Sequence, residues 1–73
     1  MKIEYDPKAD ALYLRLSKGR VAETKCVGKN TFVDLDKNGN TLGIEILFFG
    51  KKFNLNDLAK LTVSLPSSIR KAA

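Results

Sequence analysis

Apolar and polar residues alternate along most of the first 49 residues, which is the pattern of β-strands with one buried face. The alternation is strictest in residues 11–17, where Leu12, Leu14 and Leu16 fall on one face. Gly, Pro, Asn or Asp interrupts the pattern at four places, as turns require. Five strands are therefore predicted, over residues 2–6, 11–17, 21–27, 31–36 and 41–48.

The last two of these strands form the best-specified hairpin. Asn38-Gly39 predicts a two-residue type I′ turn, because both turn positions need positive φ. That turn sets the register, with the pairs Leu35–Leu42, Val33–Ile44 and Thr31–Ile46 on one face. The opposite face then carries Phe32, Asp34, Asp36, Thr41, Gly43 and Glu45. Gly43 is interpreted as a close-packing or bulge position.

A second hairpin is predicted between residues 11–17 and 21–27, with a three-residue loop at 18–20. This loop places Leu16 opposite Ala22 and Leu14 opposite Thr24, and it sets Arg15 against Glu23 on the outer face. A two-residue loop is less favourable, since it places Leu14 opposite Glu23.

The period changes after residue 53, where a short helix is predicted over residues 54–62. Asn54 is a suitable N-cap, and Leu55, Leu58, Ala59 and Thr62 follow helical spacing. Residues 66–73 form a polar, basic tail after Pro66. The predicted fold is mainly β (α+β). It is a curved antiparallel β-meander of about five strands over 1–49 with one short C-terminal α-helix, all within a single domain, 1–73.

The chain has 73 residues and one Cys, so no internal disulfide can support its small core. A domain of this size buries only about 60% of its unfolded surface, and one short helix cannot cover a five-stranded sheet. We therefore expect a homodimer, in which a second subunit covers the aliphatic face. Strong curvature of the sheet is the alternative.

The net charge of +5 is concentrated in the last third of the chain. Lys51, Lys52, Arg70 and Lys71 form a candidate basic patch, which makes a nucleic-acid-associated protein one alternative function. No recognised nucleic-acid-binding motif accompanies these residues. No apolar run is long enough for a membrane span and no signal sequence opens the chain, so we expect a cytoplasmic protein without a membrane partner.

The residues Asp34-x-Asp36-x-Asn38-Gly39-x5-Glu45 match the EF-hand loop pattern. Their context argues against an EF-hand, because the flanking residues alternate as strands instead of forming helices. Asp, Asn and Gly also form tight turns, which explains the match. A cation-binding protein that uses this acidic hairpin is the second alternative, although no metal site and no cofactor are predicted.

Catalysis has little support in the sequence. The chain has no His, the usual acid–base group near neutral pH. Cys26 has no His partner and falls in a predicted strand, so a packing role is expected for it. We predict that the protein is not an enzyme and assign no catalytic residues.

Residues 5–16 (YDPKADALYLRL) and 34–47 (DLDKNGNTLGIEIL) resemble the two blocks of a family of short prokaryotic proteins catalogued as a domain of unknown function. The resemblance covers about residues 2–48 and implies no activity. Some relatives look like they are encoded beside small toxin-like proteins, which implies an antitoxin-like, partner-binding role. If the family shares a site, its carboxylates are the candidates, together with two tyrosines: Tyr5, Asp6, Asp10, Tyr13, Asp34, Asp36 and Glu45.

Tyr13 and Phe32 fall on the face opposite the aliphatic one, where exposed aromatic side chains favour a contact surface. The alternative is a second small core beneath the loops. The leading hypothesis is a self-associating protein-interaction module, which acts through this aromatic and acidic face or through a strand edge open to an added strand.

Overall fold

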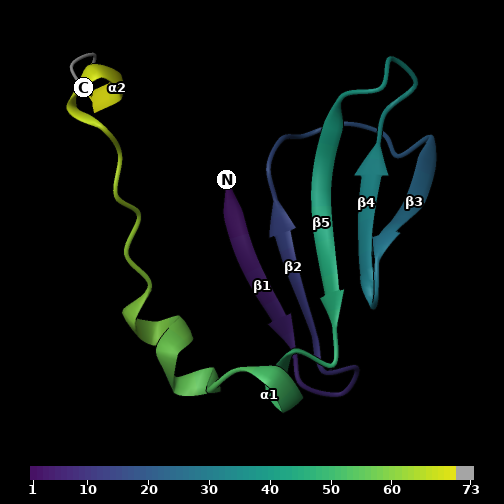
Figure 1. The fold of residues 1–73 in the computed structure, drawn as a ribbon. Helices are drawn as coiled ribbons and strands as arrows, with labels where there is room; N and C mark the ends of the chain where they lie inside the picture. Colours follow the sequence, from purple (N-terminus) through teal and green to yellow (C-terminus); the bar gives the residue numbers. More distant parts are fainter. Residues whose placement is uncertain (71–73) are drawn as a thin grey trace.

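The structure is a computed structural model that describes residues 1–70, with side chains for residues 1–68. It contains one five-stranded antiparallel sheet in the order β1-β2-β5-β4-β3 (Figure 1). The strands are β1 (Lys2–Asp6), β2 (Ala11–Arg15), β3 (Glu23–Gly28), β4 (Thr31–Leu35) and β5 (Thr41–Leu47). Three short helical pieces follow: α1 (Phe49–Lys52), the 3-10 helix η1 (Leu55–Lys60) and α2 (Ser67–Arg70). The mainly β class and the five antiparallel strands are thus confirmed.

Alternation along each strand gives the sheet two different faces. On the aliphatic face, Leu12 lies opposite Ile46, and Ile44 lies between Leu14 and Val33. The aliphatic face consists of Ile3, Tyr5, Leu12, Leu14, Val33, Ile44 and Ile46. The polar face consists of Glu4, Tyr13, Arg15, Phe32, Asp34, Gly43 and Glu45.

The predicted hairpin between the second and third strands is wrong, and the sheet is not a sequential meander. β2 pairs with β5, while β3 lies at the far edge beside β4. The connecting segment crosses the end of the sheet, where the Leu16 N–H donates to the Leu42 carbonyl and the Ala22 N–H to the Leu35 carbonyl. The aliphatic residues of β2 thereby gain aliphatic partners on β5. In the predicted register, pairing with β3 would instead place Leu14 opposite Thr24 and Leu16 opposite Ala22.

The hairpin of β4 and β5 forms with the predicted pairs Thr31–Ile46 and Val33–Ile44. Its turn is not of type I′, because of the two predicted turn residues, Asn38 and Gly39, only Gly39 has positive φ, at 84°. The loop closes where the Asp36 N–H donates to the Asn40 carbonyl, 3.0 Å away, and this gives the three-residue loop that often carries a glycine of positive φ. The ladder then shifts by one residue, and Leu35 lies opposite Thr41 instead of Leu42.

The predicted α-helix over residues 54–62 forms as a shorter 3-10 helix. Asn54 is its N-cap as predicted, and its side chain accepts from the Asn56 N–H at 3.0 Å. Short helices are stable mainly when one face packs against the protein, but Leu55 remains 39% exposed and no residue of η1 is buried. The helical turn α1, directly after β5, was not predicted.

Candidate functional site

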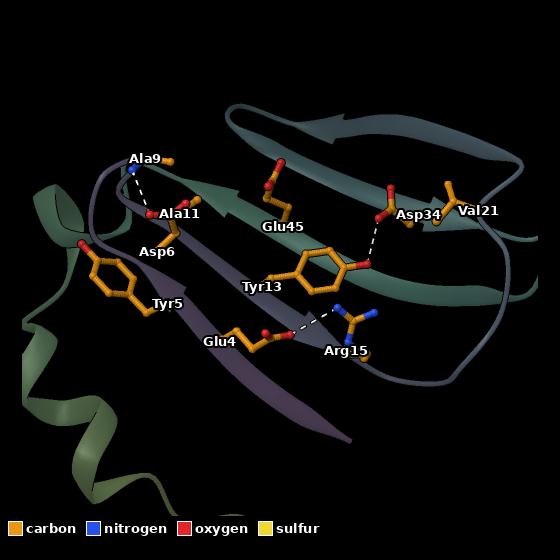
Figure 2. Close-up of a pocket in the computed structure, with 10 residues that line it drawn as sticks. All are labelled: Glu4, Tyr5, Asp6, Ala9, Ala11, Tyr13, Arg15, Val21, Asp34 and Glu45. Carbon is orange, nitrogen blue, oxygen red and sulfur yellow. Dashed lines mark hydrogen bonds and ion pairs between the residues drawn. The ribbon is translucent and has the colours of Figure 1, made fainter.

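Tyr13 is the centre of a polar cluster on the polar face (Figure 2). In register it lies between Glu4 of β1 and Glu45 of β5. Its hydroxyl donates to Oδ2 of Asp34, on β4, at 2.8 Å. The ring reaches Asp34 by crossing β5 at Gly43, where a Cβ atom would collide with the Tyr13 hydroxyl and ring. Gly43 is therefore the close-packing position that the sequence predicted.

The charged groups of the cluster are paired around this tyrosine. Oδ1 of Asp34 accepts a second hydrogen bond, from Oγ1 of Thr24 at 2.6 Å. Nη2 of Arg15 lies 3.3 Å from Oε1 of Glu4, and its guanidinium carbon lies 5.2 Å from the centroid of the Tyr13 ring. Burial, and then the hydrogen bond to Asp34, raise the pKa of Tyr13. The hydroxyl therefore remains a neutral donor at physiological pH.

The cluster borders a shallow, open hollow on the polar face. The residues that line this hollow are Glu4, Tyr5, Asp6, Ala9, Ala11, Tyr13, Arg15, Val21, Asp34 and Glu45. Four carboxylates thus face one guanidinium. The hollow suits a basic or hydrogen-bonding group of a partner better than an anion.

Asp10 forms a separate junction between the β1–β2 turn and α1. Its Oδ1 accepts from the Tyr5 hydroxyl and from the Gly50 N–H, each at 2.7 Å. Its carbonyl accepts from the Phe49 N–H at 3.0 Å, and its own φ is 51°. The hydrogen bonds from Tyr5 and from Gly50 lower the pKa of Asp10. The bond between Tyr5 and Asp10 also raises the pKa of Tyr5. Asp10 thus positions the chain that follows the sheet.

Two further predicted site residues form turns. Oδ1 of Asp6 accepts from the Lys8 N–H at 2.9 Å. Oδ1 of Asp36 accepts from the N–H groups of Asn38 and Asn40, at 2.8 and 2.9 Å. Hydrogen bonds from the Asn40 backbone and side chain are the main cause of the lowered pKa of Asp36.

The structure therefore divides the predicted site residues among several places. Tyr13, Asp34 and Glu45 lie together, and Phe32 is the register partner of Glu45 on the same face. Asp6 lines the edge of the hollow. The Tyr5 hydroxyl belongs to the Asp10 junction and points away from Tyr13 (Figure 2). Asp36 lies in the turn beyond the end of β4.

The predicted basic patch is also divided. Lys51 and Lys52 are exposed in α1 beside the sheet, whereas the backbone of Arg70 belongs to α2, at the far end of the C-terminal segment (Figure 1). Lys71 lies outside the described residues.

Within residues 1–70 no group of three or more His, Cys, Asp or Glu residues is arranged to hold a metal ion. The EF-hand pattern belongs to a β-hairpin, where Asp34 and Asp36 accept hydrogen bonds from the protein itself. Cys26 is exposed on β3, and its Sγ lies 3.3 Å from the Gly28 carbonyl oxygen. No helix in the described part of the chain is long and apolar enough to cross a membrane.

Sequence reasoning did not assign three residues to this cluster: Glu4, Arg15 and Thr24. Arg15 was placed against Glu23, but it pairs with Glu4 instead. The signal was present in the alternation, because Glu4, Tyr13 and Arg15 all point away from the aliphatic face. The place of Thr24 in the cluster could be predicted only with the correct strand order, because Thr24 lies opposite Asp34 only when β3 pairs with β4.

Comparison with protein-family models gives a match over residues 2–49 to a family described as protein of unknown function (DUF2283). The match spans the whole sheet and ends at the start of α1. No match was found among curated proteins or among solved structures.

Proposed function

We propose that this chain, which belongs to the DUF2283 family, is a small protein-interaction module that associates with itself through the aliphatic face of its sheet. The observation that carries the proposal is the incomplete core. Within the described residues, only Ala11, Leu12, Leu42 and Phe49 are buried apolar residues. No side chain there is fully enclosed.

The aliphatic face is covered only at its two ends. At one end Leu42 is 4% exposed and lies close to Gly19 of the connecting segment, and the other end is covered by α1. Phe49 of α1 packs there, with ring centroids 6.4 Å from Tyr5 and 4.7 Å from Phe53. Beyond it, Leu14 and Ile44 remain half-buried, and Ile3 is 39% exposed. A sheet with one apolar face needs a second layer, and the helical pieces within residues 1–68 do not supply one.

The accessible surface is larger than that of a compact monomer, because of both the uncovered face and the extended C-terminal segment (Figure 1). The chain exposes 5953 Å², whereas a compact folded monomer of 8.1 kDa exposes about 4,500 Å². The excess of about 1,450 Å² is greater than the roughly 800 Å² that each partner buries in a standard interface. The radius of gyration, 14.1 Å, also exceeds the value of about 11 Å for a compact domain of this length. Both values fit a subunit of a dimer better than a separate monomer.

Self-association of this kind leaves the polar face outside. The Tyr13 cluster and its hollow would then be available to a second protein partner, as exposed aromatic and acidic side chains favour. The proposed module therefore uses one face for its own dimer and the other for recognition.

Sedimentation equilibrium of the full chain tests the proposal. We expect a mass of twice 8.1 kDa at tens of micromolar concentration. Ile3→Gln places a polar amide on the aliphatic face and should raise the dimer dissociation constant by about tenfold or more. Glu4→Gln, the adjacent residue on the polar face, is the matched control and should change it by less than about threefold. A monomer at all concentrations, or equal effects of the two variants, would contradict the proposal.

A further inference from the structure

Residues 61–65 have the pattern of a β-strand but no strand partner. The segment reads Leu-Thr-Val-Ser-Leu, so that Leu61, Val63 and Leu65 fall on one side of an extended chain. These three side chains are 57%, 75% and 44% exposed. The segment has no regular secondary structure and runs clear of the sheet between η1 and α2 (Figure 1). Leaving such a segment in water is unfavourable, because the apolar side chains on one side of it remain exposed to solvent.

The two edges of the sheet differ in what they offer to such a segment. On its aliphatic side, the edge strand β3 carries Glu23 and Lys25, and charges at inward-facing positions discourage the addition of a strand. The edge strand β1 instead carries Ile3 and Tyr5 on its aliphatic side. An added strand beside β1 would continue the aliphatic face.

From this juxtaposition we propose that residues 61–65 of one copy add as a strand to the open edge of β1 in a second copy. The inference rests on the self-association proposed above and specifies how the two copies engage. With the alternation of the sheet, Leu61, Val63 and Leu65 extend the aliphatic face beyond Ile3. Thr62 and Ser64 then extend the polar face.

Charge complementarity favours the same arrangement. Lys60, the last residue of η1, directly precedes this segment and brings one ammonium group to its start. The polar side of β1 carries the exposed carboxylates of Glu4 and Asp6 together with the ammonium of Lys2, so its net charge is negative. An opposite charge on a neighbouring strand contributes a small favourable term.

The segment that occupies the β1 edge comes from a second copy, because the junction at Asp10 directs residues 61–65, here called the arm, away from the sheet of their own copy. Asp10 ties Phe49 and Gly50 to the β1–β2 turn, and the chain then departs from the sheet through η1 (Figure 1). Reciprocal exchange of two arms about a two-fold axis satisfies both β1 edges at once. Exchange would also bury part of the accessible surface by which the chain exceeds a compact monomer, because the arm contributes to that excess.

The first test compares two neighbouring substitutions in the full chain. Val63→Asp places a charge on the apolar side of the arm, and Ser64→Asp places the same charge on its polar side. Neither residue contributes to the sheet, so the protomer should fold in both variants, which circular dichroism checks. We expect Val63→Asp to raise the dimer dissociation constant at least about 30-fold, and Ser64→Asp to raise it less than about threefold. A dimer that both variants leave equally intact would overturn the arm proposal while the self-association stands. A monomeric native chain would overturn both.

The second test asks which copy holds the arm. All chains carry Cys26→Ser, since Cys26 is exposed and would react. One chain also carries Glu4→Cys, on β1, and the other Ser64→Cys, on the arm. A short bis-maleimide should join the two chains only when they are mixed. A third chain carries both Glu4→Cys and Ser64→Cys. It would cross-link within itself if the arm folded back on its own β1. Intramolecular cross-linking of that chain at high dilution, without a heterodimer in the mixture, would overturn the exchange.

Discussion

Substitution of Gly43 by alanine should destabilise the sheet, although alanine normally suits a strand better than glycine. The new Cβ would lie where the hydroxyl and ring of Tyr13 cross β5. The ring must move, and its 2.8 Å hydrogen bond to Asp34 is then lost. Overpacking costs about 1–3 kcal/mol, and loss of a hydrogen bond to a charged group costs about 1.5–3 kcal/mol. Because the ring can relieve part of the clash by leaving Asp34, the two costs overlap, and we expect about 2–4 kcal/mol in total.

A double-mutant cycle separates this clash from a general intolerance of the position. Tyr13→Val removes the ring atoms that the Cβ would meet and keeps a residue suited to a strand. In that background, Gly43→Ala should stabilise by about 0.5 kcal/mol, since glycine in a strand interior is itself unfavourable. The coupling between the two sites should therefore exceed about 2 kcal/mol.

Urea unfolding monitored by circular dichroism measures these differences. All four chains must be compared at one protomer concentration, because association contributes to the apparent stability. If Gly43→Ala destabilises both backgrounds equally, or leaves the native chain unchanged, the close crossing of Tyr13 over β5 is not the reason for a glycine at this position.

Four further outcomes follow from the hydrogen bonds of the acidic residues and of Tyr13. Asp10→Ala should lower the melting temperature by several degrees more than Asp10→Asn, because asparagine keeps an acceptor and tolerates the φ of 51°. The lowered pKa values of Asp10 and Asp36 stabilise the fold above their ordinary pKa of 3.8, and this stability is lost as the pH falls through the lowered values; a series of urea midpoints from pH 5 to about 2 should decline less steeply when both residues are asparagine. The raised pKa of Tyr13 stabilises the fold below its ordinary value of 10.0, and the stability is lost as the pH rises through the raised value; because the pKa of Tyr5 is raised as well, titration by tyrosinate absorbance should show both tyrosines ionising late, and Tyr13→Phe should remove one of the two. Calcium should leave the amide NMR shifts of residues 34–45 unchanged, and saturable shifts there would contradict the hairpin interpretation.

Local pattern predicted the strands and one hairpin because these depend on neighbouring residues. The five strand ranges agree with the structure to within two residues at each end. The pairs Val33–Ile44 and Thr31–Ile46 followed from a short turn joined to a consistent apolar face. The same reasoning failed for β2 and β3, because the connection of residues 16–22 is long enough to cross two strands. The choice of partner then depended on Leu12 and Leu14 meeting apolar side chains on β5.

The candidate site was predicted in its residue types but not in its grouping. Tyr13, Asp34 and Glu45 share a face by alternation alone, and the structure brings them together. The role of Asp10 could not be read from the sequence, because its partner Gly50 lies 40 residues away in a helical turn that the pattern does not indicate. The type I′ turn failed for a local reason, since the Asp36 carboxylate accepts from two N–H groups of the loop and favours a longer turn.

The different edges of the sheet also bear on why association should end at a dimer. A sheet with two apolar open edges can add strands on both sides and grow without limit. Here β1 presents Ile3 and Tyr5 on the aliphatic face, while β3 presents the charged Glu23 and Lys25 on the same face. A single receptive edge and a single arm per chain can be satisfied by reciprocal exchange about a two-fold axis, which leaves no edge for a third copy. Replacing Glu23 and Lys25 together by valine should remove this protection, and light scattering should then detect species larger than the dimer that the native chain does not form.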